Sequence, residues 1–292
     1  MSISRHNLSV IIVSYKSDHV IERCINSIDN KIEIIVIDNS NNDKFKKKIE
    51  QKFLNVKCIL SKKNLGMGAG NNLGIKNIKN DFAFILNPDV VLKTNSIDEI
   101  IDASKYIDAF GIVAPISDQN DYPNYKLKKN YNFDSSKPFQ VKSVDGYAML
   151  LNIKKLKQLK GFNFFDENFF MYLENDDLCK RITELNENIF IIPKSKINHL
   201  GGEAVDPRYK NEIELFRNWH WMWSKFYYNK KHYGYLVAFT KVLKNLISAK
   251  IKFIYYLVTF NNHKKKIYQM RLLGLLNSML GKKSFYRPRL DN

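Results

Sequence analysis

Hydrophobic and polar positions follow a repeating order in the first part of the chain, where short apolar runs alternate with amphipathic or polar stretches. Four mostly apolar runs, at 8–15, 33–40, 56–61 and 81–90, have the length and the β-branched content of buried strands. Helical spacing or composition marks the stretches between them, namely 19–28, 44–53 and the residues that follow a Gly/Asn loop at 64–74. Because strands alternating with helices form βαβ units, we predict an α/β fold with a mostly parallel sheet.

Polar residues end three of these runs. They are Ser14 and Tyr15, then Asp38 and Asn39, then Asn87, Pro88 and Asp89. In open α/β sheets, ligands bind outside the carboxyl ends of the strands. We therefore expect these side chains to share one edge of the sheet.

The pattern changes after the first 115 residues. Residues 118–138 are rich in Asn, Asp, Tyr, Pro and Ser without periodicity, which predicts a long loop. Further elements are expected downstream, namely an apolar segment at 144–152, a helix at 153–160, a helix from Leu178 and a strand at 188–193. We predict one domain over 1–204, with halves at 1–115 and 116–204, and a helical region over 205–292.

The composition is that of a globular protein, because 45% of the 292 residues are hydrophobic. Cys24, Cys58 and Cys179 lie far apart and form no CxxC pair, which argues against a disulfide scaffold and a zinc site. The first apolar run has only the length of a strand and lacks a small-residue cleavage site. We therefore expect no signal peptide and a cytoplasmic protein.

The formal charge of +18 is concentrated near the C-terminus. Residues 205–292 contain 18 Lys and Arg against 4 Asp and Glu, a net charge of +14, which leaves +4 for the first 204 residues. Nucleic acid and an anionic membrane are the usual partners of such a basic surface. The segment 235–260 is apolar but interrupted by lysines, and no uncharged stretch approaches the roughly 18 residues of a membrane-spanning helix. On a helical projection most of its polar positions share one arc, namely Lys241, Lys244, Asn245, Ser248 and Lys252, with Lys250 outside it.

Each polar cluster has a structural and a functional interpretation. Asp38 and Asn39 form either a turn or an acceptor for a nucleotide base or a ribose hydroxyl. The glycine-rich loop at 64–74 is either a tight turn with close helix packing or a phosphate loop, although it matches neither the P-loop nor the dinucleotide fingerprint.

The remaining clusters could bind a metal or transfer a proton. Pro88 could simply end a strand, or Asp89 could be an oxygen ligand of Mg²⁺ or Mn²⁺, with His199 as a nitrogen ligand. A lone histidine is more often structural. The acids at 174–177 suit a helix N-terminus, but the apolar residues before them also suit a general base with a raised pKa.

Taken in order, these segments resemble a known enzyme family. The similar segments are SVIIVSY, IIVIDNS, NLGMGAGNNLGI, FILNPDV, VDGYAMLLN, FDENFFMYLENDDLCKR and INHLGG, over residues 8–204. They resemble inverting glycosyltransferases of GT-A fold (glycosyltransferase family 2 type), a large bacterial family that includes rhamnosyltransferases of cell-surface polysaccharide assembly, such as O-antigen or capsule. The resemblance implies a Rossmann-like catalytic domain over 1–204, with 1–115 as the nucleotide-sugar half and 116–204 as the acceptor half.

The resemblance also implies a donor site. Ser14 and Tyr15 would lie beside the nucleotide, Asp38 would hold the base, and the loop from Asn64 would line the ribose and diphosphate. The donor-binding set is Ser14, Tyr15, Asp38, Asn39, Asn64, Gly66, Asn71, Asn72 and Asn87. Asn87 takes the place of the first acid of the family's DxD-type motif, so that Asp89 and His199 would be the metal ligands.

The catalytic segment departs from the family pattern. Relatives read Glu-Asp-x-Asp, whereas this chain has Asn175 at the second position, and an amide cannot act as a base at neutral pH. Glu174, Asp176 or Asp177 must then take the acceptor's proton, and we favour Glu174. Arg181, four residues after Asp177, could pair with it. The implied reaction is a single in-line displacement that inverts the anomeric carbon.

The implied donor is thymidine-diphosphate rhamnose or a uridine-diphosphate hexose, and the implied acceptor is a lipid-linked glycan. The basic region would then lie on an anionic membrane surface, as a peripheral protein of the cytoplasmic face. Alternatives for this region are a helical bundle with a solvated lysine face and a homo-oligomer. Alternatives for the whole chain are a nucleic-acid-binding protein, a nucleotidyltransferase and a non-catalytic sugar-nucleotide binder. We expect no nucleic acid partner, because the strand-end acids would repel phosphate.

Overall fold

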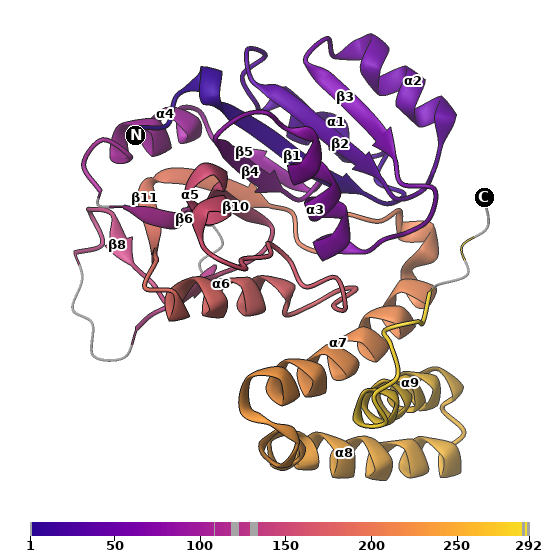
Figure 1. Cartoon of the computed structure of the whole chain (residues 1–292). Helices are drawn as coiled ribbons and strands as arrows, with labels where there is room; N and C mark the ends of the chain where they lie inside the picture. Colours follow the sequence, from indigo (N-terminus) through magenta and orange to yellow (C-terminus); the bar gives the residue numbers. More distant parts are fainter. Residues whose placement is uncertain (1, 108, 118–122, 129–133, 288–289, 291–292) are drawn as a thin grey trace. The chain divides into compact units, whose positions relative to one another are not determined.

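The computed structural model of the chain describes residues 2–107, 109–117, 123–128, 134–287 and 290 (Figure 1). The chain forms two compact units. The first contains Met1–Asp166 and Asn175–Asp206, and we call it the sheet unit. The second contains Glu167–Glu174 and Pro207–Asn292, and we call it the helical unit. Much of the loop expected at 118–138 lies outside the described residues.

The first half of the sheet has the predicted βαβ pattern. Its central strand is β1 (Leu8–Ser14), which is buried along its whole length. β2 (Glu33–Asp38) and β4 (Phe82–Leu86) flank β1, and β3 (Val56–Leu60) lies outside β2. All four strands run parallel, so their carboxyl ends share one edge.

The second half of the sheet mixes strand directions. Its strands and those of a separate small sheet are β5 (Val90–Leu92), β6 (Phe110–Ser117), β7 (Tyr125–Lys126), β8 (Phe139–Gln140), β9 (Ser143–Val144), β10 (Ala148–Asn152) and β11 (Asn188–His199). Beyond β4 the order is β10-β6-β11-β5, β8 pairs with β11, and β7 pairs with β9. β10 runs antiparallel to β4, with Ala148 opposite Leu86. The residues just before β10 therefore reach the same edge as the carboxyl end of β4.

Helices cover both faces of the sheet. In the sheet unit they are α1 (Ile21–Asn26), α2 (Asp43–Lys52), α3 (Met67–Asn77), α4 (Ser96–Ala103), α5 (Ile153–Gln158) and α6 (Glu174–Glu184), whose first residue belongs to the helical unit. Side chains of α1, α2 and α4 share one apolar core with Val10 and Ile12 of β1. Those of α3, α5 and α6 share the other core with Ile11 and Val13, because successive side chains of a strand point to opposite faces. The sheet unit is thus layered as helix, sheet and helix (Figure 1).

The run at 81–90 is not one strand, as the sequence pattern suggested. β4 ends at Leu86 and β5 begins at Val90 in a different part of the sheet. Pro88 lies between them, and proline has no N–H to continue a ladder. The Val90 N–H donates to the Asn87 carbonyl at 3.1 Å, which closes a turn.

Two later elements are longer than predicted. The strand expected at 188–193 continues as β11 to His199 after a shift in register. The helix expected from Leu178 begins at Glu174 instead. Carboxylates are favoured in the first turn of a helix by its macrodipole, so the acid cluster extends the helix rather than preceding it.

Three long helices form the helical unit, after the short 3-10 helix Pro207–Tyr209. They are α7 (Lys210–Tyr233), α8 (Tyr235–Val258) and α9 (Asn262–Met279). Their common core contains Met222, Phe226, Ala238, Val242 and Leu275. α9 crosses α7 closely, since a Cβ on Gly274 would lie 2.2 Å from the Trp219 carbonyl oxygen. None of the described helices is both long enough and apolar enough to span a membrane.

Candidate functional site

β1 and β2 end side by side at the carboxyl edge of the sheet, where Ser14 pairs with Asp38. The Asp38 carboxylate is buried and accepts backbone N–H bonds from its own turn, at 2.9 Å from Ser40 and 2.7 Å from Asn42. Burial raises the pKa of Asp38, and these N–H groups oppose the rise. The turn interpretation therefore accounts for this side chain, and its contact with a nucleotide base stays a prediction.

Ser14 and Tyr15 lie at the same edge, as their place after β1 predicted. The Ser14 hydroxyl is buried and has no hydrogen-bond partner among the described residues. The Tyr15 N–H donates to the Ser17 hydroxyl at 3.2 Å. The edge therefore has a buried hydroxyl next to the Asp38 turn that a ligand could engage.

Asn39 joins the β2 turn to the glycine-rich loop. Its side-chain amide donates to the Gly66 carbonyl at 3.2 Å and accepts from the Leu65 N–H at 3.3 Å. Gly66 has φ +84°, a backbone conformation that favours glycine, and its N–H donates to the Asn64 side chain at 3.1 Å. The predicted donor residues of these two segments are thus in direct contact.

α3 follows this loop and packs closely on β1. A Cβ on Gly70 would lie 2.9 Å from the Val13 side chain, and one on Gly74 would lie 2.5 Å from Ile11, so close packing explains both glycines. Asn71 is buried, and its Oδ1 has no hydrogen bond among the described residues. Asn72 instead donates to and accepts from the Phe165 backbone, at 2.9 and 3.0 Å. Of the two, Asn71 has the freer oxygen for a ligand.

The turn after β4 and the end of β11 form a second polar corner. Asp89 is 2% exposed, and its Oδ1 lies 3.6 Å from His199 Nε2. The two segments are held together because His199 pairs with Val90 and the Leu200 N–H donates to the Asp89 carbonyl at 3.1 Å. The ring of Tyr147 stacks on His199 at 3.9 Å between centroids. The structure therefore brings together the two residues expected to bind a metal.

This corner fits a divalent cation that completes its coordination with other ligands. The Oδ1 atoms of Asp89 and Asn87 are buried and have no hydrogen-bond partner in the described part of the chain. No cluster of three or more His, Cys, Asp or Glu side chains suited to a metal occurs among the described residues. Mg²⁺ in nucleotide sites commonly takes one or two carboxylates and completes its shell with phosphate oxygens and water, and Mn²⁺ also accepts nitrogen ligands. Asp89 and His199 match that requirement.

Asp177 forms the ion pair that the sequence suggested. It is fully buried, and its Oδ2 accepts from Arg181 Nε at 2.8 Å. The other guanidinium nitrogens of Arg181 donate to the backbone carbonyls of Asn163 and Phe164. Because this pair fixes α6 to the loop at 162–164, we regard Asp177 as a positioning group.

Asn175 contacts the segment before β10, and Asp176 contacts β7. The Asn175 amide donates to the Val144 carbonyl at 2.9 Å, and its Cβ lies so close to Gly146 that a side chain there would crowd it. Asp176 accepts from the Lys126 ammonium at 2.6 Å. Asn175 therefore has a structural role that a carboxylate could not fill, because only the amide can donate this bond.

Three residues that the sequence pattern did not predict lie near these clusters, namely Asp145, Tyr147 and Lys126. Burial raises the pKa of Asp145, the Asp176 charge raises it further, and Lys126 and His199 lower it. Asp145 thus lies in the electrostatic environment of both the acid cluster and the metal corner. Burial raises the pKa of Tyr147 to about 12, so the ring on His199 is a neutral phenol. The VDGY segment was the signal for Asp145 and Tyr147 in the sequence, but its strand pairing could not be read from the pattern, and Lys126 had no such signal.

Glu174 follows an unusual backbone segment in the helical unit. Tyr172 and Leu173 have φ angles of +69° and +65°, in the left-handed region that non-glycine residues rarely occupy. Such strain costs on the order of 1–3 kcal/mol per residue and concentrates at functional sites. Burial raises the pKa of Tyr172 to about 12, Arg217 lowers it and the Glu174 charge raises it. The backbone therefore holds the first acid of the cluster in a constrained position.

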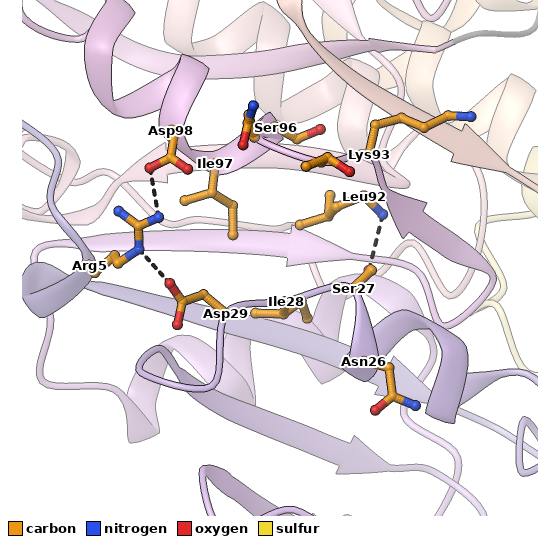
Figure 2. Close-up of a pocket in the computed structure, with 12 residues that line it drawn as sticks. Arg5, Asn26, Ser27, Ile28, Asp29, Leu92, Lys93, Ser96, Ile97 and Asp98 are labelled. Atoms are coloured by element: carbon orange, nitrogen blue, oxygen red, sulfur yellow. Dashed lines mark hydrogen bonds and ion pairs between the residues drawn. The ribbon is translucent and has the colours of Figure 1, made fainter.

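A separate hollow of about 430 Å³ lies near the amino end of β1 (Figure 2). Arg5 bridges Asp29 and Asp98 across it, at 2.6 Å each. The Leu92 N–H donates to the Ser27 hydroxyl on its wall at 3.0 Å. None of the predicted site residues lines this hollow, and Arg5 is already paired with two carboxylates. We therefore do not place the active site there.

The chain is similar to curated proteins that are named as a hexosyltransferase and a rhamnosyltransferase. It is 24% identical over 229 residues to the low-salt glycan biosynthesis hexosyltransferase Agl10 of Haloferax volcanii, covering 72% of each chain. It is 23% identical over 234 residues to the N-acetylglucosaminyl-diphospho-decaprenol L-rhamnosyltransferase of Mycobacterium tuberculosis, covering 66% of this chain and 75% of that protein.

Solved structures share the fold. The mannosyltransferase PcManGT from Pyrobaculum calidifontis, in complex with GDP-Man and Mn²⁺, superposes with a TM-score of 0.56 at 12% identity, covering 95% of this chain and 88% of that one. This likeness confirms the predicted GT-A type of α/β fold. The profile of the family described as Glycosyl transferase family 2 matches residues 9–182, more than half of the chain. The chain therefore belongs to glycosyl transferase family 2.

Proposed function

We propose that this protein transfers a hexosyl group, with rhamnose as the first candidate, from a nucleoside diphosphate to a hydroxyl of a lipid-linked glycan, with inversion at the anomeric carbon. The observation that supports it most directly is the Asp89–His199 corner, where a buried carboxylate oxygen has no hydrogen bond among the described residues. The Ser14, Asp38 and Asn39 turn ends the neighbouring half of the same edge, as a nucleotide site requires.

Asp89 and His199 would hold Mg²⁺ or Mn²⁺, and the bound ion would supply Lewis-acid stabilisation to the departing diphosphate. The Pyrobaculum mannosyltransferase, whose structure contains Mn²⁺ and GDP-Man, supports this assignment. Among the residues of the chain itself, Asn71 and Ser14 each present a buried oxygen for the donor. Thymidine-diphosphate rhamnose and a uridine-diphosphate hexose are the donors that we propose to test first.

Glu174 is our candidate for the general base. It is the first acid of the cluster, and the left-handed backbone of Tyr172 and Leu173 just before it is the kind of strain that concentrates at functional sites. As the acceptor oxygen bonds to the anomeric carbon, the hydroxyl proton would pass to the Glu174 carboxylate. The bond from that carbon to the diphosphate breaks in the same step, and a nucleoside diphosphate leaves.

The acceptor and the location follow from the relatives and the charge. The mycobacterial relative is named for a decaprenol-linked substrate, and residues 205–292 of this chain carry a net charge of +14. We propose a lipid-linked acceptor in cell-surface polysaccharide synthesis and a peripheral location on the cytoplasmic face of an anionic membrane.

A thermal-shift panel of nucleotide sugars with and without Mn²⁺ tests the proposed function. We expect one nucleotide sugar to raise the melting temperature in the presence of Mn²⁺ and to do so much less without it. Released nucleoside diphosphate, rather than pyrophosphate, would separate sugar transfer from nucleotidyl transfer. If no nucleotide sugar stabilises the protein, the proposal is wrong.

A further inference from the structure

α8 presents a continuous apolar surface on the side opposite its own core. Ala238, Val242 and Ala249 are buried against the other helices. On the far side, six side chains are between 37% and 80% exposed, and we call them the apolar ridge: Leu236, Leu243, Ile247, Ile251, Ile254 and Val258. At 1.5 Å per residue the ridge is about 33 Å long. A surface of this size is unusual for an element that faces only water.

Positive charge borders this ridge. Lys241, Lys244 and Lys252 lie along one flank and Lys250 along the other, and all four are exposed. The sequence has no Asp or Glu between Leu215 and Leu290, although 16 Lys and Arg lie there. The flanks of the ridge therefore carry positive charge, and α8 itself has no carboxylate.

This combination favours one kind of partner over two others. A second copy of the chain would oppose lysine flanks to lysine flanks. Nucleic acid would bind the lysines, but it would leave the aliphatic ridge in water, because phosphates and bases engage cationic and aromatic side chains. A bilayer with anionic headgroups accepts both features, since aliphatic side chains enter the acyl boundary and lysines stay at the phosphates.

We propose that α8 docks on an anionic lipid bilayer, parallel to its surface, with the apolar ridge inserted. The inference rests on the proposed function and names the surface on which the lipid-linked acceptor would be met. None of the described helices is suited to span a membrane, which agrees with a helix that lies in the interface.

The same helical unit holds the segment that leads to Glu174. The Ser224 hydroxyl of α7 donates to the Met171 carbonyl at 2.8 Å. Phe170 stacks on His220 at 4.9 Å between centroids, and the Arg287 guanidinium lies 3.5 Å over the Phe170 ring. Docking of α8 would therefore fix, relative to the bilayer, the unit that carries the proposed base.

Vesicle sedimentation tests the proposal. Wild type is expected to sediment with vesicles of phosphatidylcholine and phosphatidylglycerol, more weakly with phosphatidylcholine alone, and less as salt is raised. The double variant I247E/I251E should reduce the partition coefficient about tenfold or more, because it places two carboxylates on the inserted face. The charge-matched control Q269E/N277D, at one exposed and one half-buried polar position of α9, should stay within about threefold of wild type because it removes no apolar side chain.

A second measurement reports insertion directly. The native cysteines are buried, so a polarity-sensitive fluorophore can be placed on I251C or on the flank variant S248C. Emission should shift to the blue with anionic vesicles at position 251 and much less at position 248. Circular dichroism and nucleotide-sugar thermal shifts without vesicles should match wild type in every variant, which separates failure of docking from failure of the proposed function.

Three results would overturn the docking proposal. One is equal sedimentation of I247E/I251E and wild type. Another is a wild-type dimer that becomes monomeric in I247E/I251E without any vesicle binding, which would assign the ridge to self-association. The third is salt-sensitive binding to RNA or DNA by a protein that leaves vesicles unbound.

Discussion

Asp38 is the last residue of β2 and Asp89 follows β4, both in the parallel half of the sheet, and both are almost fully buried, at 1% and 2% exposure. Both oxygens of Asp38 accept N–H groups of its own turn. Asp89 differs, because its Oδ1 has no hydrogen bond among the described residues and lies 3.6 Å from His199 Nε2. A buried carboxylate oxygen without a donor is costly, so a cation would relieve it. Burial and position alone do not identify a ligand site, whereas the unused hydrogen-bonding capacity does.

The strongest test of this comparison is Asp89→Asn. We expect the catalytic efficiency of sugar transfer to fall by about 10³-fold or more, because a Lewis acid at the leaving group is worth several kcal/mol. Stability without metal should stay equal or rise, since the substitution removes a buried charge and no hydrogen bond to Oδ1. Steady-state kinetics and denaturant unfolding check both parts. A catalytic efficiency within tenfold of wild type would show that Asp89 is not a metal ligand.

Glu174→Gln tests the proposed general base. Transfer should slow by roughly 10²–10³-fold, within the usual contribution of a general base, while the nucleotide sugar still binds. Glu184→Gln, at the other end of α6 and in a surface pair with Lys180, is the matched control and should leave the rate unchanged. Loss of donor binding together with the rate would mean that Glu174 holds the site together instead of taking a proton.

The sequence was informative where neighbours along the chain decide the structure. The apolar runs predicted the strands β1 to β4. The polar residues that end these runs predicted that Asp38 and Asp89 lie at one edge of the sheet. The spacing of Asp177 and Arg181 predicted their pair, because residues four apart share a face of a helix. Family similarity supplied His199, which no local pattern distinguished from a structural histidine.

Contacts between distant segments could not be read in this way. Asp145 reaches the site because β10 runs antiparallel to β4, and nothing in the apolar run at 148–152 specifies its partner or direction. The segment Glu167–Glu174 belongs to the helical unit through contacts such as that of Ser224 with Met171. Likewise, the polar spacing predicted the lysine arc of α8, but it did not predict which apolar face of that helix would be covered.

Asp38→Ala is the counterpart of Asp89→Asn, because it removes a carboxylate whose two oxygens both accept hydrogen bonds. We expect the free energy of unfolding to fall by about 3 kcal/mol, since two N–H groups lose charge-assisted bonds and relief of a buried charge offsets part of that loss. The difference should be measured by denaturant unfolding at neutral pH. A change smaller than that caused by Asp89→Asn would contradict the division between a structural and a ligand-binding aspartate.

His220 extends the comparison to the helical unit, because both of its ring nitrogens have partners. Nε2 lies 2.8 Å from the Tyr286 carbonyl, which can only accept, so Nδ1 accepts from the Ser284 hydroxyl at 3.0 Å. Burial lowers the pKa of His220 to about 3. Between pH 6.5, the ordinary pKa of histidine, and about pH 3, His220 is protonated in the unfolded chain but not in the folded chain. The stability of the fold therefore falls as the pH drops through this range.

Acidification from about pH 7 to about pH 5 should thus lower the free energy of unfolding by about 1–2 kcal/mol through this group. His220→Asn should be less stable at neutral pH but should lose less on acidification. His263→Asn, which replaces an exposed histidine of α9 that pairs with Glu214, is the matched control for the loss of one histidine. If His220→Asn keeps the full acid sensitivity, the ring is not held neutral by its surroundings. The rule drawn from Asp38, that a buried group with all its hydrogen bonds made has a structural role, would then fail for His220.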